Sequence, residues 1–197
     1  MSEAALPISE GPKRPIEAPA LRQRYAFART AAEDGDEVLH VEVWVDPGGG
    51  VTPHVHPTME ERFEILGGSP SFLAGRKWET ARPGDTVVVP PGTRHAFRND
   101  GAEVAHFVGH ARPPSTLQEF LEDTAGLSRA GMLTRRGVPK GLSGLLAGAV
   151  LVHHYRDMVQ LLFPPLPPPW VQRLVMPALA RLGERRGYRA GRLKDLA

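Results

Sequence analysis

Three histidines and a glutamate occur at spacings that suit one bound metal ion. His54 and His56 are two residues apart in the segment GGGVTPHVHPTMEERFEILGG, residues 48–68. On a β-strand, both imidazoles would point to the same face of the sheet. His95 follows in a second segment, GDTVVVPPGTRHAFRN, residues 84–99. Because imidazole suits borderline divalent metals such as Fe, Ni, Cu and Zn, these residues indicate a transition-metal site.

Two adjacent carboxylates, Glu60 and Glu61, could supply the fourth ligand. Glu61 alternates in phase with Phe63 and Ile65, whereas Glu60 is in phase with polar residues. Since the apolar phase of a strand faces the protein interior, we predict that Glu61 points inward and Glu60 faces solvent. Three neutral imidazoles and one carboxylate leave one or two coordination positions open, which is typical of a reactive metal site.

Period-two patterns predict the strands that carry these side chains. In residues 37–45, four aliphatic residues alternate with polar or aromatic ones, so His40 and Trp44 should lie on the outer face. The β-branched run 85–90 predicts another strand, followed by a tight turn at residues 90–92. Further strands are expected at residues 24–29, 71–74, 77–81 and 103–110.

Together, the two segments resemble the paired motifs of the cupin superfamily, G-x5-H-x-H-x3–4-E-x6-G and G-x5-P-x-G-x2-H-x3-N. The matching residues are Gly48, His54, His56, Glu61 and Gly68 in the first motif, and Gly84, Pro90, Gly92, His95 and Asn99 in the second. The resemblance covers residues 25–112. It implies a mainly β fold, a double-stranded β-helix (cupin or jelly-roll) barrel, with metal ligands His54, His56, Glu61 and His95.

The resemblance also implies a function. Cupin dioxygenases suggest a metal-dependent enzyme that performs an oxygenase-type reaction on a small organic molecule, although cupin isomerases and decarboxylases use the same kind of site. One divalent transition metal is expected, with Fe, Mn or Ni favoured and Zn or Cu possible. Phe63 and Phe97 would line the substrate pocket, and Glu61 could also act as a base.

His106 and His110 are further candidates for acid–base chemistry. They would reach the metal only if their face of the strand 103–110 turns inward, and both faces of that strand are apolar enough to be the inner one. Otherwise they would be hydrogen-bonded histidines at a subunit or domain contact. A non-catalytic, metal-dependent binding or sensor module stays open as the alternative function, because a fold does not fix a function.

Composition narrows the class of protein. The chain has 197 residues, 41% of them apolar, so a folded domain is expected. The absence of cysteine excludes disulfides and thiolate ligands. A net charge of +2 and the lack of a helix-turn-helix pattern argue against a nucleic-acid partner. Residues 1–20 lack an apolar signal-peptide core, so we expect a flexible leader and a cytoplasmic location.

Residues 114–197 are expected to form a helical extension of a barrel that spans residues 21–113. Ser115 and Gln118 have capping-box spacing, and a helix starting there would bury Leu117, Phe120, Leu121 and Thr124. A second helical stretch is predicted at residues 142–163, where Gly144 and Gly148 favour close packing. The proline-rich residues 164–169 would link it stiffly to a last helix.

The last helix carries a regular apolar stripe, with a kink expected at Pro177. The stripe consists of Val171, Leu174, Val175, Ala178, Leu179 and Leu182. We expect it to pack on the barrel or on a second subunit, and we expect a homodimer anchored by Trp44. Seven basic residues follow residue 171, so contact with an anionic membrane surface is the alternative.

Overall fold

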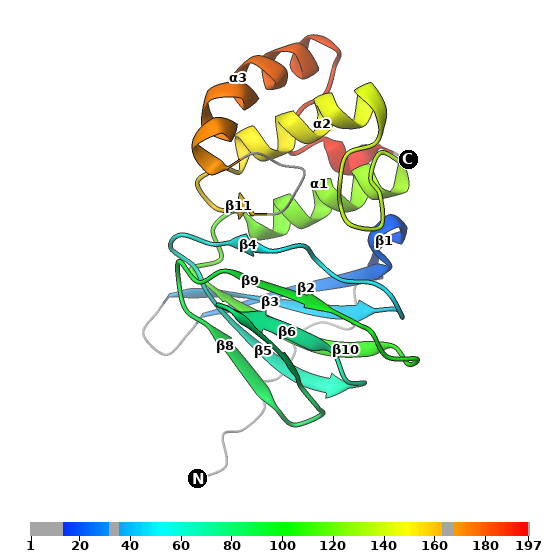
Figure 1. The fold of residues 1–197 in the computed structure, drawn as a ribbon, viewed down its shortest axis with the longest axis vertical. Coiled ribbons are helices and arrows are strands. Elements are labelled where there is room, and N and C mark those ends of the chain that lie inside the picture. Colours follow the sequence, from blue (N-terminus) through cyan, green and yellow to red (C-terminus); the bar gives the residue numbers. More distant parts are fainter. Residues whose placement is uncertain (1–13, 32–35, 163–167, 197) are drawn as a thin grey trace.

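The computed structural model describes residues 14–31, 36–162 and 168–196. Two antiparallel sheets form a β-barrel, and three α-helices are stacked over one end of it (Figure 1). The larger sheet contains β1 (Ile16–Ala18), β2 (Gln23–Ala31), β3 (Glu37–Val45), β10 (Ala105–Arg112), β5 (Glu60–Gly67) and β8 (Thr86–Val89), in that order. The smaller sheet contains β11 (Gln160–Leu161), β4 (His54–Val55), β9 (His95–Arg98), β6 (Ser71–Ala74) and β7 (Lys77–Thr80).

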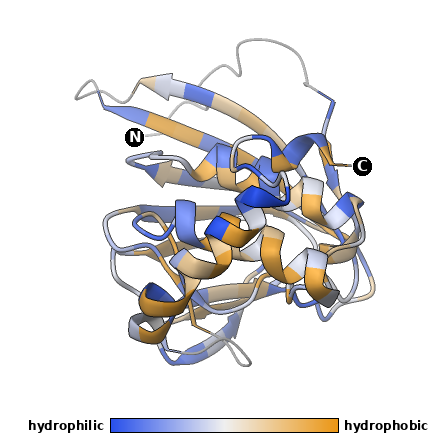
Figure 2. Ribbon diagram, turned by 90° about the horizontal axis from the view of Figure 1, so that it is seen from above, coloured by the Kyte–Doolittle hydropathy of each residue, from blue (hydrophilic) through white to orange (hydrophobic). Residues whose placement is uncertain are grey.

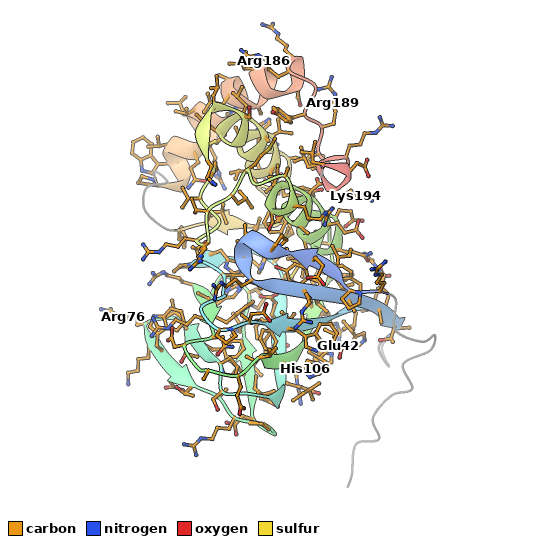
Figure 3. All side chains as sticks on the ribbon, turned by 90° about the vertical axis from the view of Figure 1, so that its right-hand side faces the viewer. Glu42, Arg76, His106, Arg186, Arg189 and Lys194 are labelled. Carbon is orange, nitrogen blue, oxygen red and sulfur yellow. The ribbon has the colours of Figure 1, made fainter. Side chains whose placement is uncertain are left out.

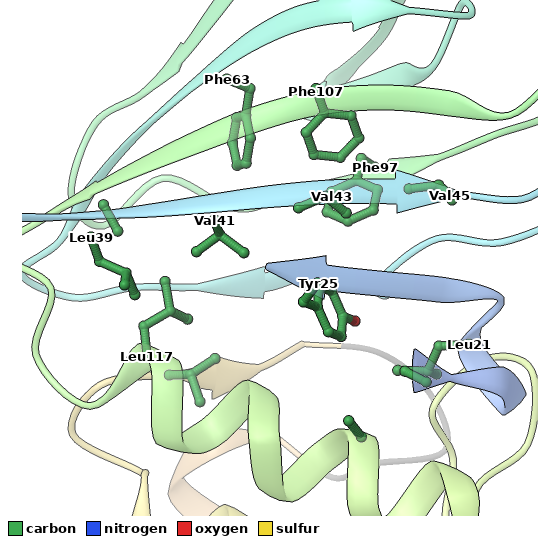
Figure 4. Packing of buried hydrophobic residues seen from close by; sticks show 14 of the residues in the cluster. Leu21, Tyr25, Leu39, Val41, Val43, Val45, Phe63, Phe97, Phe107 and Leu117 are labelled. Atoms are coloured by element: carbon green, nitrogen blue, oxygen red, sulfur yellow. The ribbon is translucent and has the colours of Figure 1, made fainter. Parts of the chain in front are cut away.

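The interior of the barrel follows the predicted alternation. On β3, Leu39, Val41, Val43 and Val45 are all at most 5% exposed, as the period-two pattern predicted. Four phenylalanines, Phe63, Phe72, Phe97 and Phe107, fill the space between the sheets, with ring centroids 5.0–6.4 Å apart. Figure 4 shows Phe63 and Phe107 above the strand that carries Val41 and Val43. This apolar core holds the two sheets in a fixed register.

The helical extension packs directly on the barrel. Helix α1 (Leu117–Arg129) lies next to the sheets, and its Leu117 points toward the strand that carries Leu39 and Val41 (Figure 4). Helix α2 (Gly141–His154) lies over α1, and α3 (Pro169–Arg185) packs on α2 (Figure 1). Within the described residues, the extension therefore meets the barrel through α1 and β11.

A buried carboxylate ties this layer together. Asp123 of α1 is fully buried and accepts hydrogen bonds from the Tyr155 hydroxyl at 3.0 Å, the Gly191 amide at 2.6 Å and the Lys194 amide at 3.0 Å. These donors come from the end of α2 and from the C-terminal segment that contains the 3₁₀ turn Leu193–Asp195. Since a buried carboxylate is costly without such partners, Asp123 specifies how the last residues dock on α1.

The two glycines of α2 make close contacts, but not the helix packing that their spacing predicted. A Cβ on Gly144 would lie 2.6 Å from the Met132 carbonyl oxygen, and one on Gly148 would lie 2.9 Å from Cγ of Pro139. Both contacts are with the loop at residues 132–139 rather than with another helix. Small residues at these two positions therefore let the loop approach the helix backbone.

Three expected boundaries are wrong. Residues 16–18, placed in the leader, form β1 and pair with β2. Helix α1 begins at Leu117, and no side chain caps it, because Gln118 bonds Glu122 and Arg29 instead of a backbone amide. The helix predicted for residues 142–163 ends at His154, because Gln160 and Leu161 pair with β4 as the strand β11. Residues 163–167, in the proline-rich link, lie outside the described residues.

The apolar stripe of the last helix is not buried as expected. Leu174 is 75% exposed, Val175 42% and Leu182 40%. The buried side of α3 consists instead of Gln172, Met176, Ala180 and Gly183. The helix also continues through Pro177 without a break. None of the helices in the described ranges is both long and apolar enough to cross a bilayer.

We predict that Gly144→Ala destabilises the fold by about 1–3 kcal/mol, because the new methyl group would overlap the Met132 carbonyl. Ser143→Ala, at the exposed neighbouring position, is the matched control and should change stability by less than about 0.5 kcal/mol. Urea unfolding of both variants measures the difference. Equal stability of the two variants would contradict the close helix–loop contact.

Candidate metal centre

Four side chains converge at the end of the barrel that faces the helices. One potential ligand atom from each of His54, His56, Glu61 and His95 lies within 4.8 Å of the other three. His54 of β4 stands directly opposite His95 of β9 in the smaller sheet, whereas Glu61 comes from β5 of the larger sheet. The four predicted ligands are thus brought together between the two sheets.

Each imidazole is oriented by a backbone carbonyl. Nδ1 of His54 lies 2.8 Å from the Thr52 oxygen, Nδ1 of His95 lies 2.9 Å from the Thr93 oxygen, and Nδ1 of His56 lies 2.8 Å from the Met158 oxygen. Because a carbonyl oxygen can only accept, each Nδ1 must carry the proton and donate it. Each neutral ring therefore presents an unprotonated Nε2, the form in which histidine binds a metal.

Glu61 points inward, as the strand parity predicted. It is 9% exposed, while Glu60 is exposed. Its Oε2 lies 2.7 Å from Nε2 of His95 and 3.6 Å from Nε2 of His56. Neither Oε2 of Glu61 nor Nε2 of His95 makes a well-directed hydrogen bond. These two buried atoms lie close together without a hydrogen bond between them. Such an arrangement is expected when both atoms bind the same cation.

The electrostatics of the group suit a cation. Burial alone would raise the pKa of Glu61, but the neighbouring imidazoles outweigh burial and lower it from 4.5 to about 2. Burial, together with His95 and His56, holds the pKa of His54 well below 6.5. Burial also opposes protonation of His95, but the Glu61 carboxylate outweighs it and raises the pKa of His95, so a proton competes with a metal ion there.

The other motif residues build the loops that hold these ligands. The Gly92 amide, in the turn before β9, donates to the His56 carbonyl at 2.8 Å and so links the two histidine segments. Asn99 is 1% exposed, and its side-chain amide donates to the carbonyls of Val45 and Glu103 at 2.8 and 2.7 Å. Gly92 and Asn99 therefore have structural roles, because they hold the loops beside the four donors in place.

A cavity of about 170 Å³ extends from the four ligands toward the helices. Phe63 and Phe97 line the cavity, as expected. Gln23 contributes an amide group and Tyr25 a hydroxyl group. Its helical wall contains Leu117, Phe120, Leu121, Leu151, Val152 and Met176. Arg136 and Leu145 are the exposed members at its outer end. The barrel and the extension therefore enclose the cavity jointly.

His106 and His110 lie on the outer face of β10, while Phe107, Gly109 and Ala111 face inward. His106 Nε2 contacts Glu42 Oε1 at 2.8 Å, and Figure 3 shows the two residues together on the barrel. His110 Nδ1 lies 2.8 Å from Nδ1 of His40. Neither His106 nor His110 lines the cavity, so the expectation that they act beside the metal is not supported.

Sequence reasoning missed the contribution of the extension. The Met158 carbonyl orients His56 across 102 residues of chain, and α1 and α2 supply one wall of the cavity. A backbone carbonyl leaves no side-chain signal, so Met158 could not be recognised. The apolar residues of the two helices were recognisable as buried, but not as cavity-lining.

The fold and the site define a β-barrel with a metal-type donor set between its sheets. The family model Cupin_2, described as a cupin domain, matches residues 41–109. Residues 41–109, which contain all four donors, therefore match a cupin domain. None of the curated proteins compared with the chain matches it.

Several solved structures are similar over about half of the chain. A double-stranded β-helix protein from Klebsiella pneumoniae has a TM-score of 0.42 and 22% identity, covering 48% of this chain and 79% of that one. The polyketide cyclase RemF from Streptomyces resistomycificus has a TM-score of 0.42 and 22% identity, covering 56% and 79%. A sugar phosphate isomerase from Silicibacter pomeroyi has a TM-score of 0.41 and 20% identity, covering 48% and 61%.

We predict that the protein binds about one transition-metal ion per chain and that the double variant His54→Ala/His56→Ala does not retain it, since two of four ligands are too few for selective binding. Elemental analysis of both proteins measures the loss. The double variant His106→Ala/His110→Ala removes two histidines from the outer face and should keep its metal. An unchanged metal content in the His54/His56 variant would disprove the site.

Glu61→Gln should weaken metal retention by at least about tenfold, because an amide oxygen replaces the only carboxylate among the four donors. Glu60→Gln makes the same chemical change one residue away on the solvent side and should have no effect. Metal release to a chelator, followed by absorbance, compares the two. Loss of metal from the Glu60 variant alone would show that the strand register is wrong.

Proposed function

We propose that this protein is a metal-dependent cupin enzyme that acts on a small, largely apolar molecule in an oxygenase-type reaction. The observation that carries the proposal is the position of the four donors at the inner end of an apolar, partly enclosed cavity. A structural metal site is closed by its ligands, whereas this donor set leaves room for a substrate oxygen.

The donor set fits a divalent transition ion, with Fe, Mn or Ni favoured and Zn or Cu possible. Three imidazole nitrogens and one carboxylate oxygen, with no thiolate in a chain that lacks cysteine, suit an ion of intermediate softness. Held by His54, His56, Glu61 and His95, such an ion would supply Lewis-acid or redox chemistry to a substrate oxygen bound beside it.

The cavity sets the size and polarity of the substrate. A cavity of about 150 Å³ can hold a benzene ring, so about 170 Å³ suits a single ring or a short branched chain. Phe63, Phe97 and the helical wall would exclude water from the apolar part of the molecule. Gln23 lies beside Tyr25, whose hydroxyl donates to the Gln23 amide oxygen at 2.6 Å, so this pair is already satisfied and would position rather than react.

A non-catalytic binding or sensor module is the second candidate, and a specific observation favours it. Among the described residues that line the cavity, Tyr25 and Arg136 are the titratable ones besides the four predicted ligands. Burial raises the pKa of Tyr25, and arginine stays protonated. A reaction that needs proton transfer would therefore have to use one of the four donors or the substrate itself, and a module that only binds needs no such group.

Oxygen uptake by the Fe(II)-loaded protein, with a panel of single-ring and short aliphatic molecules bearing adjacent oxygen donors, tests the proposal. We expect saturable uptake with at least one compound and none in His54→Ala/His56→Ala. Leu121→Trp should raise KM by about tenfold or more by filling the cavity, while its metal content stays unchanged.

Leu66→Trp is the matched control, because Leu66 is 50% exposed and does not line the cavity. Product analysis by NMR separates the outcomes. Conversion without oxygen uptake would replace the oxygenase assignment with an isomerase or decarboxylase. Tight binding with no conversion by the Fe-, Mn- or Ni-loaded protein would favour the binding module.

A further inference from the structure

Helix α3 presents an apolar face to solvent. Trp170 is 71% exposed and Leu174, one turn later, is 75% exposed; Val175 and Leu182 are 42% and 40% exposed. Large apolar side chains at this exposure are common singly, but a row of them along one helix marks an interaction surface. We call Trp170, Leu174, Val175 and Leu182 the α3 apolar face.

The orientation of α3 is fixed by its opposite side. Met176, Ala180 and Gly183 are buried, and a Cβ on Gly183 would lie 2.7 Å from the Leu146 carbonyl of α2. Gln172 is 6% exposed, and its side-chain amide donates to the Leu161 carbonyl at 3.0 Å. Rotating α3 to bury its apolar face would break this contact and separate the helices, so the exposure is built into the fold.

Positive charge accompanies this face. Residues 168–196 contain seven basic and two acidic residues, a net charge of +5, while the chain as a whole has only +2 and the remainder is therefore −3. Arg181 and Arg185 follow Trp170 and Leu174 by eleven residues, or about three helical turns, which places them on the same side of the helix. Figure 3 shows Arg186, Arg189 and Lys194 at the helical end of the molecule, away from Glu42 on the barrel.

We propose that α3 docks in the plane of an anionic membrane surface. Trp170 and Leu174 would enter the boundary between headgroups and acyl chains, and the arginines would contact lipid phosphates. Apolar and basic residues on one helix face are the features by which interfacial helices bind such surfaces. Figure 2 views the molecule from this end and shows hydrophobic stretches along the ribbons of the helices.

The positive charge of residues 168–196 favours an anionic membrane over a second copy of the chain as the partner of the α3 apolar face. A second copy of the chain would bring two surfaces of net charge +5 together, and like charges disfavour that contact. An anionic lipid surface complements the same charge, and it accepts a tryptophan without requiring a shaped pocket. The acidic remainder of the chain would then face away from the membrane.

Sedimentation of the full-length protein with vesicles tests the proposal. We expect binding to vesicles of phosphatidylcholine with phosphatidylglycerol that is at least about tenfold tighter than binding to phosphatidylcholine alone, and that weakens as salt is raised. In a Trp44→Phe/Trp78→Phe background, the fluorescence of Trp170 should shift to the blue on binding. The His54→Ala/His56→Ala variant should bind equally well, so the result is independent of the metal site.

Matched variants locate the surface. Leu174→Glu and Arg181→Glu/Arg185→Glu should each weaken binding by about tenfold or more. Leu66→Glu and Arg76→Glu/Arg82→Glu make the same changes at exposed barrel positions and should leave binding intact. All six positions are exposed, so the thermal midpoint should stay the same.

Three results would overturn the proposal. The first is no binding to the anionic vesicles at low salt. The second is equal binding by the wild-type protein and Leu174→Glu. The third is a wild-type dimer that Leu174→Glu converts to a monomer while neither protein binds vesicles, which would assign the α3 apolar face to a second copy of the chain.

Discussion

The hydrogen bond from Nδ1 of His56 to the Met158 carbonyl is the contact on which the rest of the structure depends. It joins the barrel to the helical extension across 102 residues and fixes the ring so that Nε2 faces the other donors. Beside it, the Leu162 amide donates to the Pro53 carbonyl at 2.9 Å, and β11 pairs with β4. The extension therefore covers the edge of β4, the strand that carries His54, which would otherwise be unpaired.

The same part of the extension therefore orients His56 and closes the cavity. The end of α2 places Leu151 and Val152 in the cavity wall. The segment after it supplies both the Met158 carbonyl and Val159, which also lines the cavity. Excluding water there strengthens every charge interaction among the donors, because the local dielectric constant falls. The four donors of this chain thus lie at the inner end of an apolar enclosure.

The sequence predicts the group of four donors well because its information is local. The two-residue spacing of His54 and His56 and the phase of Glu61 follow from strand periodicity, and the buried Glu61 and exposed Glu60 confirm it. The inner face of β10 could not be predicted, because both of its faces are apolar. Its orientation is set by pairing with β3 and β5, where Phe107 lies opposite Val43 and Ile65. Such long-range registers are absent from any local pattern.

Helix α3 shows why an apolar stripe does not always predict burial. Two helices pack at a distance set by the size of the residues between them, so small residues decide which sides can meet. Gly183 and Ala180 allow α3 to approach α2 closely, and Val150 and the Leu146 carbonyl leave no room there for a leucine. The side of α3 that packs on α2 is therefore the one with small residues, although it includes Gln172. The more hydrophobic side of α3 stays exposed to solvent. The apolar stripe in the sequence therefore marks an exposed surface of α3 and not a part of the protein core.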